Sequence, residues 1–183
     1  MMGRLAPNLA QSHGETRDMA DITFKGNPIH TNGELPAVGT QAPKFELIST
    51  GLASKSLADY AGKRVVLTIN PSYDTGVCQA TARGFNQKVG ESDDVVVLMV
   101  SADLPFAQKR FCEAEGLDHV EALSTFRSGF AKDWGIMIAD GPMQGLTARA
   151  VVVLDPAGKV LYSELVPEIV QEPNYDAALA ALG

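Results

Sequence analysis

Three continuous runs of apolar, mostly β-branched residues constrain the fold of this 183-residue chain more than any other feature. They cover Val65–Ile69, Val95–Val100 and Ala150–Leu154. A strand with one solvated face alternates apolar and polar residues, whereas a continuous apolar run is typical of a strand that is covered on both faces. The three runs therefore predict the central strands of one sheet with structure packed on both of its sides.

The segments between these runs indicate the fold class. Helices are expected over residues 77–89 and 105–115, the second beginning with a proline that suits a first helical turn. The third run leads through a turn at Asp155–Gly158 into Val160–Leu165, which predicts an antiparallel hairpin. Strands alternate with helices and an antiparallel pair ends the sheet, so the expected fold is α/β, with a mixed central sheet flanked by helices.

Shorter elements complete this frame. An N-terminal β-hairpin is predicted from Ile22–Lys25 and Ile29–Thr31 around a turn at Gly26-Asn27-Pro28. The remaining expectations are short strands at 45–48 and 120–123, a helical turn at 56–60, a short helix at 129–134, and a closing helix at 174–182 capped by Asn174.

The first twenty residues differ from the rest of the chain. They contain no apolar run beyond two or three residues, whereas a secretory signal requires an apolar core of about 7 to 15 residues. We therefore expect a flexible N-terminal extension or tag at 1–20, one domain over 21–183, and a cytoplasmic protein. The chain also lacks the roughly 18 to 20 consecutive apolar residues of a membrane-spanning helix, so no membrane association is expected.

Charge and cysteine content exclude several classes of function. The chain has 15 Lys and Arg against 22 Asp and Glu, a formal net charge of −7, which argues against a surface that binds nucleic acid. Two cysteines are too few for a disulfide-rich scaffold or a four-cysteine zinc site. The three histidines lack ligand spacing with either cysteine, which argues against a metal site or a Cys-His hydrolase, and the sequence has no glycine-rich loop for a nucleotide cofactor. Paired thiols in a cytoplasmic protein are more often catalytic or redox-sensing.

Cys78 occupies a position that favours a reactive thiol. It follows the first apolar run and lies in the first turn of the expected helix over 77–89, where unpaired amide N–H groups and the helix dipole favour an anion. The thiolate is the reactive form of cysteine. A helix terminus supplies about 0.3 to 1 kcal/mol, less than the roughly 2.7 kcal/mol that would make a thiolate the major form at neutral pH. A further positive group is therefore required.

The residues around this cysteine resemble a known family. Pro71, Thr75 and Cys78 form the pattern Pro-x-x-x-Thr-x-x-Cys, which is similar to the active-site motif of the peroxiredoxins. The longer strings PSYDTGVC, SADLPFAQKRFC and GLTARAVVV resemble the thiol peroxidase branch, the atypical two-cysteine peroxiredoxins. The resemblance runs from about Ile22 to the C-terminus and implies a thioredoxin-like fold.

The resemblance also implies a role for each site residue. Cys78 would be the peroxidatic cysteine, and Arg149 would supply the positive charge that its thiolate requires. Thr75 would hold the peroxide in line for attack, and Pro71 would shield the thiolate from water. Cys112 would be the resolving cysteine of a disulfide within one chain. Because a disulfide requires Cα atoms roughly 4.4 to 6.8 Å apart, we expect both cysteine segments to unwind partly on oxidation.

The implied activity is the reduction of hydrogen peroxide and organic hydroperoxides without a cofactor. The implied partners are thioredoxin as the reductant and a second copy of the chain, in a homodimer built on the face near the active site. A non-catalytic redox sensor on the same scaffold is the alternative, and Cys112 could instead simply pack on an apolar helix face. A purely structural disulfide conflicts with the expected cytoplasmic location.

Several residues near the motif have more than one interpretation. Arg83 and Arg127 compete with Arg149 for the role of active-site arginine. Asn70 and Tyr73 depart from the aliphatic or aromatic residues of the family pattern, and we expect this departure to change pocket polarity without touching the catalytic set. Other residues are candidates for a pocket or a dimer face, with core packing as the default: Phe45, Tyr73, Leu104, Phe106 and Ile138.

Overall fold

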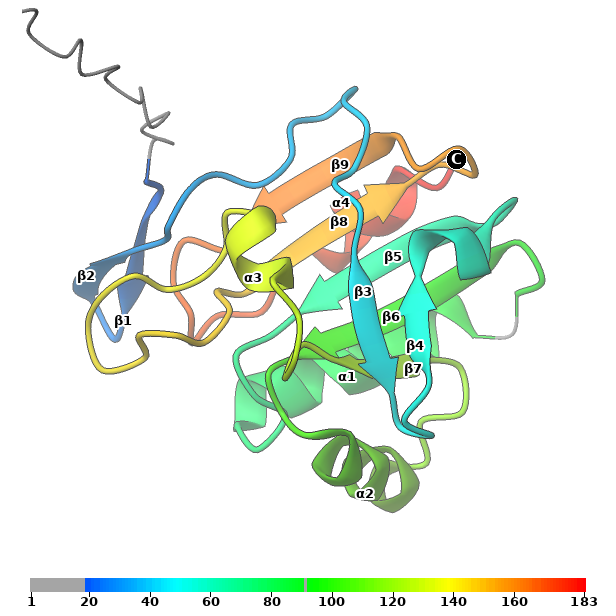
Figure 1. The fold of residues 1–183 in the computed structure, drawn as a ribbon, viewed down its shortest axis with the longest axis horizontal. Coiled ribbons are helices and arrows are strands. Elements are labelled where there is room, and N and C mark those ends of the chain that lie inside the picture. The colour runs from blue at the N-terminus through cyan, green and yellow to red at the C-terminus, as the bar shows by residue number, and fades with distance from the viewer. Residues whose placement is uncertain (1–18, 91) are drawn as a thin grey trace, which may run out of the picture.

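A mixed sheet organises the computed structural model, which describes residues 19–90 and 92–183. Nearly all of the predicted extension at 1–20 lies outside the described residues. Within them, seven strands form the sheet in the order β4-β3-β7-β6-β5-β8-β9 (Figure 1). Their bounds are β3 Glu46–Ser49, β4 Ser54–Ser56, β5 Arg64–Ile69, β6 Val95–Ser101, β7 Glu121–Ser124, β8 Ala150–Leu154 and β9 Val160–Leu165.

The three apolar runs form the centre of this sheet, as predicted. β5 pairs in parallel with β6 and antiparallel with β8, and β8 pairs antiparallel with β9. All five residues of β8 are buried. The α/β class, the mixed sheet and the terminal hairpin are thus confirmed.

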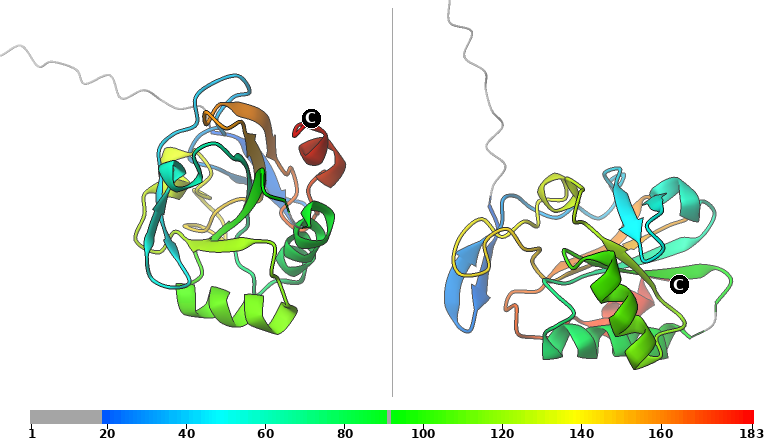
Figure 2. Two further views of the ribbon diagram at one scale, coloured as in Figure 1. Left: turned by 90° about the vertical axis from the view of Figure 1, so that its right-hand side faces the viewer. Right: turned by 60° about the horizontal axis from the view of Figure 1, so that its bottom comes forward.

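Alternate residues of the central strands point into two apolar layers. On one face, Val66 packs in a cluster with Phe85 of α1 (Gly76–Val89) and Ala178 of α4 (Tyr175–Ala180). On the other, Leu67 packs in a cluster with Trp134, which follows α3 (Phe130–Asp133). Figure 2 shows α1 and α4 on the side of the sheet opposite α3. This double cover explains why the strands carry apolar residues at nearly every position.

Helix α2 (Pro105–Glu115) lies beside β7 and ends at Gly116, whose φ of 62° is left-handed. The buried Gln108 side chain donates from Nε2 to the carbonyl oxygen of Leu123, at 3.0 Å. This bond ties the helix to β7. Among the described residues, no helix has the length and apolar character needed to cross a membrane.

The N-terminal hairpin forms, but its turn differs from the prediction. β1 (Asp21–Phe24) and β2 (Asn27–His30) are joined by Lys25 and Gly26, both with positive φ (52° and 77°). Two-residue turns with positive φ at both positions match the twist of the flanking strands. The predicted turn at Gly26-Asn27-Pro28 is therefore wrong, since Asn27 and Pro28 already pair with β1.

One strand has no signal in the sequence. β4 is a three-residue Ser-Lys-Ser segment that pairs with β3 at the sheet edge. Its pairing follows from the position of β3, because its own residues have no apolar alternation. The predicted helical turn follows directly as a 3₁₀ helix at Leu57–Tyr60, and the Asn174 side chain caps α4 by accepting from the Ala177 amide.

Candidate active site

The register of two strands brings the functional residues together. Ile69, the last residue of β5, pairs with Ala150, the first residue of β8. Because these strands are antiparallel, the turn that follows β5 and the residue that precedes β8 lie at the same end of the sheet. This places Arg149 next to Asn70 and to the turn that leads into α1.

Cys78 lies at the centre of this arrangement. It is the third residue of α1, fully buried, and its thiol is free. Its Sγ atom lies 2.8 Å from Oγ1 of Thr75 and 3.2 Å from Nη2 of Arg149. The predicted threonine and arginine therefore converge on the sulfur atom of the predicted peroxidatic cysteine, near the N-terminus of α1.

The Thr75 hydroxyl has two hydrogen-bond acceptors for its single hydrogen. Its Oγ1 lies within reach of Cys78 Sγ and 3.1 Å from the carbonyl oxygen of Ser72. When Cys78 is a thiol, its own hydrogen can point to Oγ1 while the hydroxyl donates to Ser72. When Cys78 is a thiolate, the hydroxyl can turn and donate to the sulfur. The hydroxyl thus suits both charge states.

Arg149 is held by neutral groups. Its side chain is buried, with 2% exposed. Nε donates to the Ile169 carbonyl at 2.9 Å, and Nη1 donates to Oδ1 of Asn70 at 2.6 Å and to Oγ1 of Thr81 at 3.4 Å. Among the hydrogen bonds of the described residues, none joins this guanidinium to a carboxylate. Its positive charge therefore remains available to the sulfur.

A hollow of about 330 Å³ opens beside these groups. Pro71, Thr75 and Arg149 line it together with apolar side chains from three other segments. The N-terminal hairpin contributes Phe24 and Lys25, and the remaining lining residues are Gly76, Val77, Met143, Ile169 and Val170. Pro71 is itself buried, which agrees with a shielding position.

Cys112 lies on α2 as a free, half-buried thiol. It packs against the apolar cluster that contains Cys78 and Tyr73, so both cysteines border one apolar region. Burial raises the pKa of the Cys112 thiol to about 11, with a smaller contribution from the charge of Glu113. In this reduced arrangement Cys112 is therefore a neutral thiol at physiological pH.

The competing arginines lie elsewhere. Arg83 forms an ion pair with Glu115, and the guanidinium of Arg127 lies 5.5 Å from the ring centroid of Phe126. Of the possible pocket or interface residues, Phe45, Tyr73 and Ile138 are buried as the default predicted. For two others that default is wrong, because half or more of the side chain is exposed: Leu104 (51%) and Phe106 (66%).

Asn70 takes part in the site, contrary to the prediction. The expectation that its departure from the family pattern leaves the catalytic set untouched is wrong, because Asn70 accepts a hydrogen bond from Arg149. Thr81 was missed as well, although its position three residues after Cys78 puts both on one helix face. Asp103 had no local signal. It accepts from the Ser72 hydroxyl and the Tyr73 amide and so holds the active-site turn.

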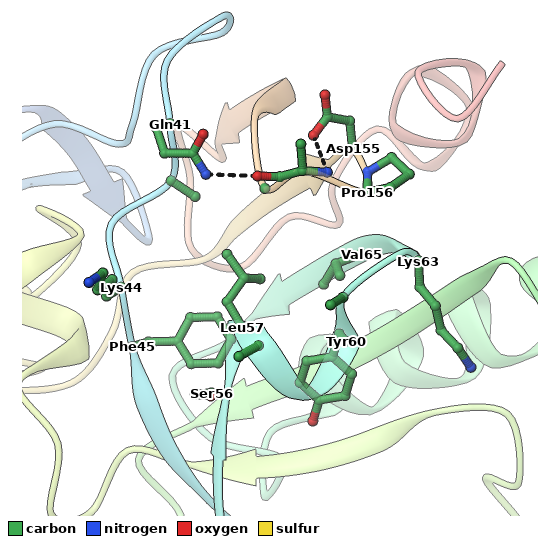
Figure 3. Close-up of a pocket in the computed structure, with 15 residues that line it drawn as sticks. Gln41, Lys44, Phe45, Ser56, Leu57, Tyr60, Lys63, Val65, Asp155 and Pro156 are labelled. Atoms are coloured by element: carbon green, nitrogen blue, oxygen red, sulfur yellow. Dashed lines mark hydrogen bonds between the residues drawn. The ribbon is translucent and has the colours of Figure 1, made fainter.

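A larger hollow of about 550 Å³ lies between the segment that precedes β3, the 3₁₀ helix and the turn between β8 and β9 (Figure 3). Phe45, Leu57 and Val65 line it, and near its rim the Gln41 side chain donates to the Ala157 carbonyl. None of the predicted catalytic residues Pro71, Thr75, Cys78, Cys112 and Arg149 lines this hollow, although Phe45, a candidate pocket residue, does.

Comparisons with known proteins agree with this geometry. The Redoxin family model matches residues 37–179. Thiol peroxidases of Mycobacterium bovis and Mycobacterium tuberculosis are 56% identical over 165 residues, which cover 90% of this chain and 99% of theirs.

Solved structures show the same fold. A peroxiredoxin-like protein from Aquifex aeolicus has a TM-score of 0.84 and 38% identity, over 90% of this chain and 97% of that one. A thiol peroxidase from Chromobacterium violaceum has a TM-score of 0.79 over 88% of this chain and 94% of that one, and at 22% identity it supports the fold alone. The chain therefore belongs to the redoxin family and, within it, to the thiol peroxidases, so that it is a peroxidase of the peroxiredoxin type.

Proposed function

We propose that this protein reduces hydrogen peroxide and organic hydroperoxides through a Cys78 sulfenic acid and a Cys78–Cys112 disulfide, and that thioredoxin recycles it. The observation that carries this proposal is the convergence of the Thr75 hydroxyl and the Arg149 guanidinium on the Cys78 sulfur. The sequence similarity to thiol peroxidases supports the same reaction class.

In the first step, the Cys78 thiolate attacks the distal oxygen of the hydroperoxide. A sulfur–oxygen bond forms, the oxygen–oxygen bond breaks, and the leaving oxygen departs as water or an alcohol once it has taken up a proton. The negative charge moves from sulfur to the leaving oxygen during this step. Arg149, whose hydrogen bonds go to neutral groups, is placed to stabilise that charge at both ends of its path.

In the second step, the Cys112 sulfur attacks the Cys78 sulfenic acid. A disulfide forms, the sulfur–oxygen bond breaks, and water leaves. Cys112 is half-buried and its pKa is raised to about 11 by burial, so its thiol must leave the apolar cluster to ionise readily. Partial unwinding around both cysteines supplies that exposure, and a reduced dithiol then returns both thiols by exchange.

The pocket beside the sulfur supports organic hydroperoxides as substrates. Phe24, Met143, Ile169 and Val170 present apolar surface next to Thr75, in a hollow of about 330 Å³. An alkyl or aryl group can displace water from this surface, whereas hydrogen peroxide makes no use of it. We expect a lower KM for an aryl hydroperoxide than for hydrogen peroxide.

The exposed apolar residues support a homodimer near the active site. Leu104 and Phe106 lie at the start of α2, directly after Asp103, which holds the active-site turn. Phe126 is also exposed, and Ser124, two residues before it, donates to the carbonyl oxygen of Asp103. A second copy of this chain would cover these apolar side chains.

The reaction is tested by peroxide-dependent oxidation of thioredoxin, measured with the wild type, Cys78→Ser and Cys112→Ser. We expect turnover by the wild type with hydrogen peroxide and with cumene hydroperoxide, and none by Cys78→Ser. The Cys112→Ser variant is expected to form the sulfenic acid without sustained turnover. Turnover by Cys78→Ser would refute the proposed nucleophile, whereas full turnover by Cys112→Ser would remove only the resolving role. Thiol oxidation without turnover in the wild type would favour a redox sensor.

A further inference from the structure

Asn70 connects the two halves of the site through a fully buried side-chain amide. Its backbone is fixed from two sides, because its amide donates to the Val100 carbonyl and its carbonyl accepts from the Thr147 hydroxyl. Its side-chain Oδ1 accepts from Arg149, and Nδ2 donates to Thr68 Oγ1 at 3.2 Å and to the Tyr73 hydroxyl at 3.0 Å. Since a guanidinium can only donate, Oδ1 must face Arg149 and Nδ2 must face Tyr73.

Tyr73 extends this connection to the helix that carries Cys112. Its buried ring stacks on Phe111 of α2, with centroids 5.3 Å apart and an interplanar angle of 19°. Phe111 precedes Cys112 directly, and both pack against the cluster that contains Cys78 and Tyr73. Burial raises the pKa of Tyr73 well above its ordinary value, and negative charge on either cysteine raises it further. Tyr73 therefore stays a neutral phenol while the thiols react.

We propose that Asn70 is a positioning residue that aims Arg149 at Cys78 and, through Tyr73, holds α2 and Cys112 in their reduced arrangement. The proposal rests on the function proposed above and adds a physical link between its two steps. Asn70 acts on the first step through the arginine and on the second through the tyrosine.

The choice of an amide rather than a carboxylate matters for the first step. Asparagine accepts a hydrogen bond from Arg149 without neutralising the charge that the sulfur requires. A carboxylate of nearly the same shape would pair with the guanidinium and weaken its field at Cys78. The Asn70→Asp substitution therefore tests electrostatics with little change in volume.

The hydrogen bond to Tyr73 matters for the second step. Forming the disulfide requires movement of the Cys78 turn, of α2, or of both, and the stacked Tyr73 ring joins the two. Tyr73→Phe removes the hydroxyl and keeps the ring and its stacking on Phe111, while Asn70 retains Thr68 as an acceptor. Without the hydrogen bond from Asn70, the Tyr73 ring holds α2 less firmly to the Cys78 turn. The two segments then move apart more easily, so we expect the disulfide to form faster.

The test follows both steps in single turnover with one equivalent of hydrogen peroxide. Quenching with acid and a thiol-blocking reagent, followed by mass spectrometry, resolves the sulfenic acid from the disulfide. We expect Asn70→Asp to slow Cys78 oxidation about tenfold or more. The loss should stay smaller than the roughly 10²- to 10³-fold that follows when a charge-stabilising donor is removed altogether. The time-course profile of Cys78 alkylation by iodoacetamide should also be slower than in the wild type. We expect Tyr73→Phe to leave oxidation unchanged and to accelerate disulfide formation about fivefold, the worth of one typical hydrogen bond.

Thr31→Val is the matched control, because it also removes a buried threonine hydroxyl that donates to a backbone carbonyl, that of Gly33, and it lies after β2, outside the connections of Asn70 and Tyr73. It should change neither rate by more than the assay error. A wild-type alkylation profile in Asn70→Asp would overturn the first half of the proposal, and an unchanged or slower disulfide step in Tyr73→Phe would overturn the second. Equal changes in Thr31→Val would attribute the effects to destabilisation and so overturn both. The alkylation profile needs no peroxide, so it still tests Asn70 if the wild type fails to react with peroxide and the proposed function itself fails.

Discussion

At the scale of single residues, the chemistry of this protein depends on what surrounds one sulfur atom. Cys78 has a hydroxyl at 2.8 Å and a guanidinium nitrogen at 3.2 Å. The sulfur and the guanidinium are buried, whereas Thr75 is exposed. In such surroundings a fixed charge acts more strongly than it would in water. The helix N-terminus adds to this effect but is too weak to replace it.

The role of Arg149 leads to the first prediction. Arg149→Gln removes the charge that faces the sulfur, so we expect the second-order rate of Cys78 oxidation by hydrogen peroxide to fall about 10²- to 10³-fold. Arg149→Lys should lie between that variant and the wild type, because it keeps a charge and loses the guanidinium fork. Stopped-flow kinetics on variants with a native circular dichroism spectrum provide the measurement. Exposed Arg127→Gln serves as control, and an equal loss there would contradict the assignment.

Burial of Cys112 leads to the second prediction. In a Cys78→Ser variant, Cys112 is the chain's remaining thiol. Its pKa is raised by burial from 9.0 to about 11, so its alkylation rate by iodoacetamide should keep rising until about pH 11 in the folded protein. In urea the same profile should level off near pH 9, because the unfolded thiol is solvated. A native profile that already levels off near pH 9 would show that Cys112 is exposed in the reduced state.

At the scale of elements, the N-terminal hairpin forms one wall of the pocket and is fastened by one carboxylate. Glu168, in the loop after β9, accepts hydrogen bonds from the Thr23 hydroxyl and from the amides of Lys25, Gly26 and Val170. Partial burial works against ionisation, but these donors outweigh it and lower the pKa of Glu168 to about 2. The hairpin therefore depends on the ionised form of Glu168.

The third prediction concerns this carboxylate and acid. The folded protein holds the Glu168 proton more weakly than the unfolded chain, whose pKa is 4.5. Its stabilisation is thus present above pH 4.5 and is lost as the pH falls toward 2. We expect Glu168→Gln to lower the urea midpoint at pH 7 and this difference from wild type to shrink at pH 3.

A comparison at the protein surface controls for general charge effects. Glu113→Gln removes an exposed carboxylate that lies 3.9 Å from the Lys109 ammonium, and it should leave the urea midpoint nearly unchanged at both pH values. A Glu168→Gln deficit of the same size at pH 7 and pH 3 would mean that the charge of Glu168 does not fasten the hairpin.

At the scale of the whole molecule, three exposed apolar residues, Leu104, Phe106 and Phe126, lie on the start of α2 and the loop after β7, two segments linked through Asp103 to the active-site turn. The fourth prediction is that Phe106→Glu converts a dimer of the wild type into monomers, because a buried unpaired carboxylate opposes association. Sedimentation velocity measures this change directly. Val38→Glu is the matched control, since Val38 is 62% exposed in the loop between β2 and β3, which lies away from α2 (Figure 1). A monomeric wild type, or a dimer unaffected by Phe106→Glu, would show that this face is not a dimer interface.

The local sequence pattern predicted some elements of the fold and failed to predict others. The buried strands, the start of α2 at Pro105 and the cap at Asn174 follow from residue types that act on their own neighbours. β4 could not be predicted, because a Ser-Lys-Ser segment becomes a strand only when β3 offers it an edge. The observed hairpin turn starts one residue earlier and ends two residues earlier than predicted for a similar reason, since strand twist selected Lys25 and Gly26 over a proline-containing alternative.

The sequence by itself determined the fold class and the family and singled out the candidate reacting groups, because apolar runs and the Pro71–Cys78 motif are local properties of the chain. Only the tertiary structure decided that Arg149, rather than Arg83 or Arg127, reaches the Cys78 sulfur. Only the tertiary structure made Asn70 part of the site, through the antiparallel register of β5 and β8. The physical reason is that hydrogen bonds between residues 71 or 79 positions apart depend on strand pairing, which no local pattern encodes.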